Sequence, residues 1–235
     1  MSSRQTLASP AALSYYTLRK AVGVIALSLP FALPAGRILL ELLAPGHTLS
    51  HPLLQQSISD YYYTPVGDVL VGSLCAIATI LICTRGYSRT DQIAGYIAGV
   101  ATLGVGLFPS VNPDHAQLTQ LEVEIGFAHS GFAALMFLTL AYFCLVLFRR
   151  TSPGKKITRR KQLRNRIYAA CGVVILACNA LMASLVIPMI DHVLRQYDPL
   201  LLFETLSLVA FGVAWLTKGE GLMKDRPPNQ ARGSG

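Results

Sequence analysis

The sequence predicts an all-α integral membrane protein built from six transmembrane helices. Six apolar stretches each approach the ~20 residues that an α-helix needs to cross a bilayer. Hydrophobic residues make up 52% of the 235 residues and charged residues only 14%, with a mean hydropathy of +0.47. This composition is too apolar for a water-soluble domain. The lipid bilayer is therefore expected to be the main solvent of the chain.

The six spans are expected, in chain order, at Leu18–Leu43, Val66–Cys83, Ile93–Pro109, Gly126–Phe148, Ile167–Ile190 and Pro199–Leu216. A polar segment, residues 1–17, precedes this transmembrane domain of residues 18–217, and a polar tail, residues 218–235, follows it. Pro30 and Pro34 each remove a backbone donor from the first span. That helix is therefore predicted to be bent or broken.

Basic residues gather on one side of the predicted membrane. Eighteen of the twenty Lys and Arg residues lie in the N-terminal segment with the first turn of the first span, the second-to-third connection, the fourth-to-fifth connection and the C-terminal tail. Only Arg37 and Arg195 lie toward the other side. Because segments rich in Lys and Arg stay in the cytoplasm, both termini are predicted to be cytoplasmic. Most acidic residues lie on or near the outer side, so we expect the functional polar groups on that side.

The connection from Arg149 to Arg166 is the most basic, with nine Lys and Arg residues. The positive-inside rule explains this run of basic residues as a signal that keeps the connection in the cytoplasm. The same run would also attract anionic lipid headgroups, at ~1 kcal/mol per charge. The formal net charge of +8 might point to a nucleic acid. Membrane topology accounts for this charge, so no nucleic-acid partner is expected.

The second and third spans carry local signals. Thr64 and Pro65 predict an N-cap and a first helical residue, which puts Asp68 in the first turn, where the helix dipole favours a carboxylate. In the third span, Gly95 and Gly99 have the small-residue spacing that allows close helix contact in lipid. This face is predicted to be tightly packed, or to dock a membrane partner or a second copy of the chain.

Three ionisable residues form the main candidate site. Counting ~1.5 Å per residue from the outer helix ends, Asp68, His129 and Glu204 lie at similar shallow depths on the second, fourth and sixth spans. Ionisable groups inside a membrane are costly unless paired or hydrated. A carboxylate beside an imidazole can relay protons, bind a cation or activate a water molecule. The alternative is a structural network, or groups that face interfacial water.

The outer connection before the second span adds Ser59, Tyr61, Tyr62 and Tyr63. Tyrosines at a membrane edge usually anchor in the headgroup region, and the alternative is the mouth of a ligand pocket. No phosphate-binding loop, no HExxH helix and no lysine beyond the first turn of a span is present, which excludes the corresponding nucleotidases, metalloproteases and retinal pigments. The residues assign no metal site and no cofactor.

Several motifs carry a family resemblance: Ser57-Ile-Ser-Asp-Tyr-Tyr-Tyr-Thr-Pro65, Asp68-Val-Leu-Val-Gly72, Arg85-Gly-Tyr87, Gly104-Val-Gly-Leu-Phe-Pro109, Asn165-Arg-Ile-Tyr168 and Phe211-Gly-Val-Ala-Trp-Leu-Thr-Lys-Gly-Glu220. With them, from about Ala21 to Glu220, the chain resembles a bacterial polytopic family catalogued as domain of unknown function 998. The resemblance implies a six-helix protein of the bacterial inner membrane and no established activity.

A more distant likeness is to membrane hydrolases related to alkaline ceramidase, which are similar in placing Ser, Asp and His at helix ends around a zinc ion. Ser59, Asp68 and His129 are the residues that would match. The chain departs from that pattern because its last predicted span lacks an HxxxH pair and because six spans are predicted where seven are expected.

Three functional hypotheses follow. The first is a protein that binds a small ligand, lipid or cation in an outward-facing polar pocket, for sensing or transport. Asp68, His129 and Glu204 would line this pocket, with the three tyrosines at its mouth. The second is a metal-dependent membrane lipid hydrolase, and the third is an accessory subunit of a membrane complex.

Overall fold

The structure is a computed structural model that describes residues 10–44, 52–84, 88–115, 117–151, 158–194, 197 and 199–219, except the side chains of residues 10–16 and 191. These residues form helices and their connections, and no β-strand occurs among them. The elements are α1 (Pro10–Leu43), η1 (Ser59–Tyr63), α2 (Gly67–Cys83), α3 (Arg89–Leu107), α4 (Gln120–Tyr142), the π-helical turn η2 (Phe143–Leu147), α5 (Arg159–Ser184), α6 (Pro188–Leu194) and α7 (Pro199–Lys218).

Four helical stretches are long and apolar enough to cross a membrane: Thr17–Leu43, Gln120–Leu147, Arg159–Ser184 and Pro199–Lys218. They confirm the membrane protein that the composition predicts. Of the other two predicted spans, α2 is apolar but has only 17 residues. α3 has 19 residues and begins with the polar sequence Arg-Thr-Asp-Gln.

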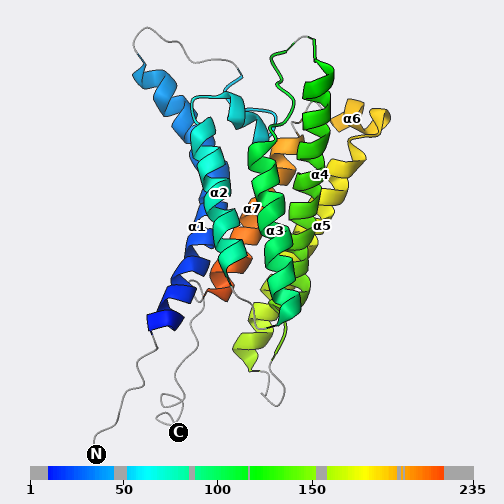
Figure 1. Ribbon diagram of the computed structural model, residues 1–235. Helices are drawn as coiled ribbons and strands as arrows, with labels where there is room; N and C mark the ends of the chain where they lie inside the picture. Colours follow the sequence, from blue (N-terminus) through cyan, green and yellow to red (C-terminus); the bar gives the residue numbers. More distant parts are fainter. Residues whose placement is uncertain are drawn as a thin grey trace, which may run out of the picture.

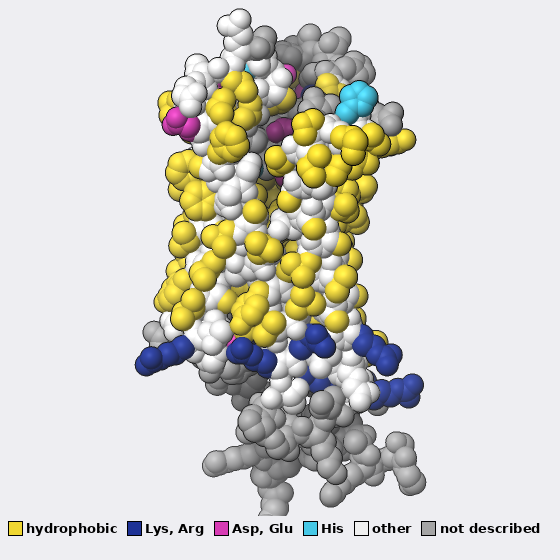
Figure 2. All heavy atoms as spheres, turned by 90° about the vertical axis from the view of Figure 1, so that its right-hand side faces the viewer, with side chains coloured by type: hydrophobic (Ala, Val, Ile, Leu, Met, Phe, Trp, Pro, Cys, Tyr) yellow, Lys and Arg dark blue, Asp and Glu magenta, His cyan; other side chains and the backbone are white. Residues whose placement is uncertain are grey.

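The six long helices form a closed ring in which each packs against the next, and α7 packs against both α5 and α1 (Figure 1). α1 begins and α7 ends at the same end of this bundle (Figure 1). Figure 2 shows Lys and Arg side chains in a belt at this end, below a broad band of hydrophobic side chains. We call it the basic end.

The first helix runs unbroken from Pro10 to Leu43 through Pro30 and Pro34. It is therefore not broken there, and the alternative of a bend stays a prediction. Leu29 and Leu33 are buried on the neighbouring turns, where α1 packs on other helices of the ring. Membrane helices tolerate proline because neighbouring elements compensate for the freed backbone groups.

The helix boundaries around the fifth span also differ from the prediction of Ile167–Ile190. α5 begins earlier because Thr158 Oγ1 accepts the Lys161 N–H at 3.2 Å and caps the helix. α5 ends at Ser184, before Pro188, which lacks a backbone donor and disfavours helix in the residue before it. A separate short helix, α6, begins at that proline.

The start of α2 is set by the preceding turn rather than by a Thr64 cap. The Thr64 hydroxyl donates to the Tyr61 carbonyl at 2.7 Å, and Val66 holds the N-cap position without a side-chain bond. The predicted Thr64 cap is therefore wrong, because η1 uses that hydroxyl. Asp68 does lie in the first turn of α2, as predicted.

The small-residue face of α3 packs against α2. A Cβ atom at Gly95 would lie 2.9 Å from the Leu81 carbonyl oxygen, and one at Gly99 would lie 2.9 Å from that of Ala78. Only glycine allows such close approach of two backbones. This face is therefore occupied within the chain and is not free to dock a partner or a second copy through Gly95 and Gly99.

Candidate functional site

The connection between α1 and α2 closes the end of the bundle opposite the basic end. Arg37 is buried and pairs with Glu41 one turn along α1, at 2.9 Å. Its guanidinium also donates to the Pro52 carbonyl at 3.1 Å. Farther along the connection, the Gln56 carbonyl accepts the Leu201 N–H of α7 at 2.9 Å. These bonds fix the backbone that leads into η1.

Hydrogen bonds tie η1 to the segment that follows α3. Ser110 Oγ donates to Asp60 Oδ1 at 3.0 Å, and the Tyr63 hydroxyl donates to the Ser110 carbonyl at 2.6 Å. The Asp60 N–H donates to Ser57 Oγ at 3.0 Å. Burial raises the pKa of Asp60 above its ordinary value, while the bonds to Ser57 and Ser110 and the nearby His129 act in the opposite direction.

His129 projects from α4 and is buried between two hydrogen-bond partners. Its Nδ1 lies 2.7 Å from the Phe108 carbonyl oxygen, and its Nε2 lies 3.0 Å from Ser59 Oγ. Because a carbonyl oxygen can only accept, Nδ1 must carry a proton. In the neutral ring, Nε2 therefore accepts the hydrogen bond from the Ser59 hydroxyl.

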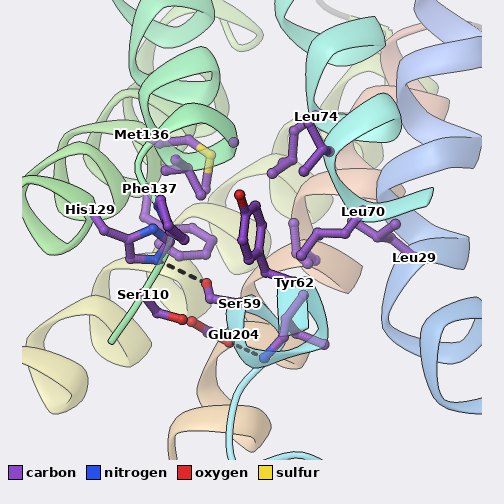
Figure 3. Close-up of a pocket in the computed structure, with 16 residues that line it drawn as sticks. Leu29, Ser59, Tyr62, Leu70, Leu74, Ser110, His129, Met136, Phe137 and Glu204 are labelled. Atoms are coloured by element: carbon purple, nitrogen blue, oxygen red, sulfur yellow. Dashed lines mark hydrogen bonds between the residues drawn. The ribbon is translucent and has the colours of Figure 1, made fainter. Parts of the chain in front are cut away.

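Glu204 projects from α7 toward the same point. Its side chain is 8% exposed, and Oε2 accepts the Ile58 N–H at 2.5 Å. Ser59 also lies against this carboxyl (Figure 3). Asp60 is close enough to act electrostatically on both His129 and Glu204. The structure thus assembles two carboxyls, one imidazole and one hydroxyl where a charge is costly without such partners.

Ser59, His129 and Glu204 form one end of a pocket of about 520 Å³, counted with its open mouth. Figure 3 shows Ser59, Ser110, His129 and Glu204 close together at this end. Apolar side chains line the rest of the pocket, among them Leu29, Leu70, Leu74, Met136 and Phe137. The ring of Tyr62 lies between the two parts, with its hydroxyl pointing toward the apolar side chains (Figure 3).

Four of the seven predicted site residues line this pocket: Ser59, Tyr62, His129 and Glu204. Asp68 does not, because it lies on the exposed surface of α2. Leu70, two residues later, faces the pocket. Two residues turn an α-helix by ~200°, which places Asp68 on the opposite side. Equal depth in the membrane did not fix the rotation of this helix.

The other two predicted tyrosines, Tyr61 and Tyr63, do not line the pocket and instead form hydrogen bonds within the fold. Tyr61 is fully buried, and its hydroxyl accepts the Gln55 N–H at 3.4 Å. Burial raises the pKa of both Tyr61 and Tyr63. The prediction missed Asp60 and Ser110. Asp60 stands between two predicted residues in the sequence, whereas nothing local to Ser110 signals its bond to η1.

The metal-dependent hypothesis gains no ligand set from the described residues. No group of three or more His, Cys, Asp or Glu side chains is arranged among them to hold a metal ion. Both ring nitrogens of His129 are engaged by Phe108 and Ser59. We assign no metal position to this pocket.

Comparison of the chain with protein-family profiles, with curated proteins and with solved structures gives no significant match in any of the three. The resemblance to the family of unknown function 998 and the likeness to ceramidase-related hydrolases stay predictions from the motifs. The site must be interpreted from its own geometry.

Proposed function

We propose that this protein binds an amphiphilic, lipid-like molecule in the pocket opposite the basic end, within a six-span bundle of a bacterial inner membrane. The basic end, where α1 begins and α7 ends, would face the cytoplasm under the positive-inside rule. With 17 and 19 residues, α2 and α3 are ~25 and ~28 Å long, close to the ~30 Å hydrocarbon core. The bacterial location rests on the family resemblance.

The observation that carries the proposal is the division of the pocket into a polar end and an apolar wall. Glu204 and His129 provide the polar end, where a headgroup can form hydrogen bonds. Leu70, Leu74 and Met136 offer the apolar contact that an acyl chain needs. Ligand pockets typically combine a largely apolar lining with a few placed polar groups.

The side chains at the polar end favour a neutral or cationic headgroup. Glu204 lines the pocket, Asp60 lies beside it, and no Lys or Arg occurs among the described lining residues. A headgroup with hydroxyl or amine donors can bond to the Glu204 carboxyl, whereas an anionic headgroup would find no described Lys or Arg in the lining to offset its charge. The Tyr62 hydroxyl can serve as a further donor or acceptor within the pocket.

A fluorescent monoacylglycerol tests this binding, because it combines hydroxyl donors with one acyl chain. The measurement is fluorescence polarisation with the purified full chain in detergent. Leu74→Trp fills the apolar part of the pocket and should abolish saturable binding. Val69→Trp is the matched control on α2, since Val69 is 53% exposed and does not line the pocket.

A fluorescent fatty acid of the same chain length serves as the anionic comparison. We expect the monoacylglycerol to bind more tightly, by about tenfold, which corresponds to one hydrogen bond to a charged group. Binding that does not saturate, or that Leu74→Trp and Val69→Trp affect equally, would refute the proposed pocket.

The pair formed by Ser59 and His129 supports a second candidate function, an acyl hydrolase that uses a serine nucleophile. The Phe108 carbonyl holds the imidazole in the tautomer whose Nε2 can take the serine proton. Ser59 Oγ would attack an ester carbonyl as its proton passes to His129. The ester C–O bond then breaks, the alcohol leaves with that proton, and water releases the acyl group as a carboxylic acid.

A fluorophosphonate probe separates this candidate from simple binding, because it bonds to an activated serine oxygen with loss of fluoride. Peptide mass spectrometry should find the label on Ser59, absent in Ser59→Ala and retained in Ser130→Ala. Ser130 is the matched control because it is exposed and adjacent to His129. Saturable monoacylglycerol binding without a label on Ser59 would reject the hydrolase and keep the binding protein.

A further inference from the structure

A second cavity lies at the basic end of the bundle, remote from the pocket described above. It measures about 460 Å³, counted with its open mouth, and α1, α3, η2 and α7 contribute to its lining. Arg19, Asp91, Phe148, Trp215 and Lys218 are the lining residues that matter for its chemistry. Neither function proposed above uses them.

Positive charge dominates this cavity. Arg19, which is 7% exposed, and Lys218 both line it. The charges of Lys161 and Arg164 on α5 lie close enough to repel the Lys218 ammonium group. Like charges brought together in a partly buried site raise the free energy of the fold unless an anion offsets them.

The described lining holds one acidic side chain, Asp91, and that carboxylate already has partners. One oxygen accepts the Ser88 N–H at 3.0 Å in the capping box of α3. The other accepts from Arg150 Nη1 at 3.1 Å. The described lining therefore holds two cationic side chains and one carboxylate, and that carboxylate is engaged outside the cavity's cationic pair.

The π-helical turn brings two of the ammonium groups to one oxygen atom. The Phe148 N–H donates to the Phe143 carbonyl at 2.9 Å and closes this turn. The Phe148 carbonyl in turn accepts from Lys161 Nζ at 3.1 Å and from Lys218 Nζ at 3.4 Å. Lys161 Nζ also donates to the Arg150 carbonyl at 3.3 Å. An ammonium group has three donors, so Lys218 keeps donors for a ligand after its bond to Phe148. Single π turns inside helices often occur at functional sites.

Trp215 adds a neutral donor to the same cavity. Its side chain is 3% exposed, and its Nε1–H has no acceptor among the described residues. A buried indole N–H normally has an acceptor, because leaving it unpaired is costly. Phe148 and Phe143 pack edge-on against the indole, with ring centroids 5.0 and 5.3 Å away, and hold it in place.

We propose that this cavity binds a phosphate group, with Arg19 and Lys218 as cationic donors and the Trp215 indole as a neutral one. The phosphate belongs either to the headgroup of an anionic phospholipid in the adjoining leaflet or to a soluble phosphorylated molecule. Basic pockets between membrane helices are a known way to hold anionic headgroups. This inference does not depend on what occupies the opposite pocket.

Thermal unfolding of the detergent-purified full chain tests the proposal with three probes: dioctanoyl phosphatidylglycerol, dioctanoyl phosphatidylcholine and inorganic phosphate. Phosphatidylglycerol should raise the Tm saturably, and the zwitterionic phosphatidylcholine should not. Lys218→Met should raise the half-saturating concentration by about tenfold or more, the effect of losing a charged hydrogen bond. Arg166→Met, which removes an exposed cation from α5, should leave that concentration unchanged.

A second variant protects the test against a fold defect in Lys218→Met. Trp215→Phe keeps an aromatic ring at this position and removes the indole N–H donor. It should raise the half-saturating concentration of phosphatidylglycerol several-fold. An equal Tm rise with inorganic phosphate alone supports the site and assigns it to soluble phosphorylated molecules. The absence of any shift with both anionic probes, or equal effects of Lys218→Met and Arg166→Met, would overturn the proposal.

Discussion

The substitution Gly99→Ala tests the packing of α3 on α2 with a single methyl group. A Cβ atom at this position would overlap Ile82 Cγ1 and would lie 2.9 Å from the Ala78 carbonyl oxygen. Non-bonded heavy atoms attract best at ~3.5 Å or more, so α3 must move away or Ile82 must change rotamer. Overpacking of this kind costs about 1–3 kcal/mol.

Gly72→Ala provides the matched control. Gly72 lies on the exposed face of α2, and a Cβ atom there would meet no atom within 4 Å. Alanine is better than glycine inside a helix by about 1 kcal/mol, a gain that both variants receive. Gly72→Ala should therefore be more stable than the parent chain, and the two variants should differ by about 1–3 kcal/mol.

The assay is the loss of helical circular dichroism during titration with sodium dodecyl sulfate, with thermal unfolding as a second measurement. For a chain of this size, 1 kcal/mol corresponds to a Tm shift of roughly 2–4 °C. If Gly99→Ala is as stable as Gly72→Ala, the close contact of α3 with α2 is refuted. Loss of an oligomer without loss of stability would instead return Gly99 to a docking role.

Three other substitutions have expected outcomes. Burial raises the pKa of Asp60 in the folded state, so the folded protein holds this proton more tightly than the unfolded chain does. The contribution of Asp60 to the free energy of unfolding is therefore present below pH 3.8 and is lost as the pH rises above it. Asp60→Asn should remove this pH dependence, which a plot of Tm against pH measures. Arg37→Met removes the buried ion pair with Glu41 and the bond to the Pro52 carbonyl, and it should lower the stability by about 3–5 kcal/mol, measured by thermal unfolding. Ser88→Ala breaks the capping box with Asp91 and should cost about 1 kcal/mol in the same assay.

The main features of the fold were predictable because two strong physical signals agree along the sequence. Apolar runs mark the helices, and Lys and Arg residues mark one end of them. The predicted helix boundaries were wrong where a capping residue or a proline sets the helix end. Thr158 starts α5 by capping it, and Pro188 ends the helical run before the predicted Ile190. The break predicted as one alternative at Pro30 does not occur, because α1 is held by its packing against other helices of the ring.

The site was predictable only in part. His129 and Glu204 stand out because an ionisable residue in an apolar run needs a partner. Asp68 carried the same signal, yet the rotation of α2 turns it outward. Asp60 enters the site instead, through a 3.0 Å bond with Ser110 that joins residues fifty positions apart. No pattern in a single sequence specifies such a long-range pair.

The two cavities can be tested independently because α7 separates them. Glu204 lies near the start of this helix and Lys218 at its end, ~21 Å apart at ~1.5 Å per residue. Substitutions at that distance normally have additive effects on stability unless a shared structural change couples them. Glu204→Gln should therefore leave phosphatidylglycerol binding unchanged, and Lys218→Met should leave monoacylglycerol binding unchanged. A reciprocal change in both affinities would mean that α7 adopts two positions and links the occupancy of one cavity to that of the other.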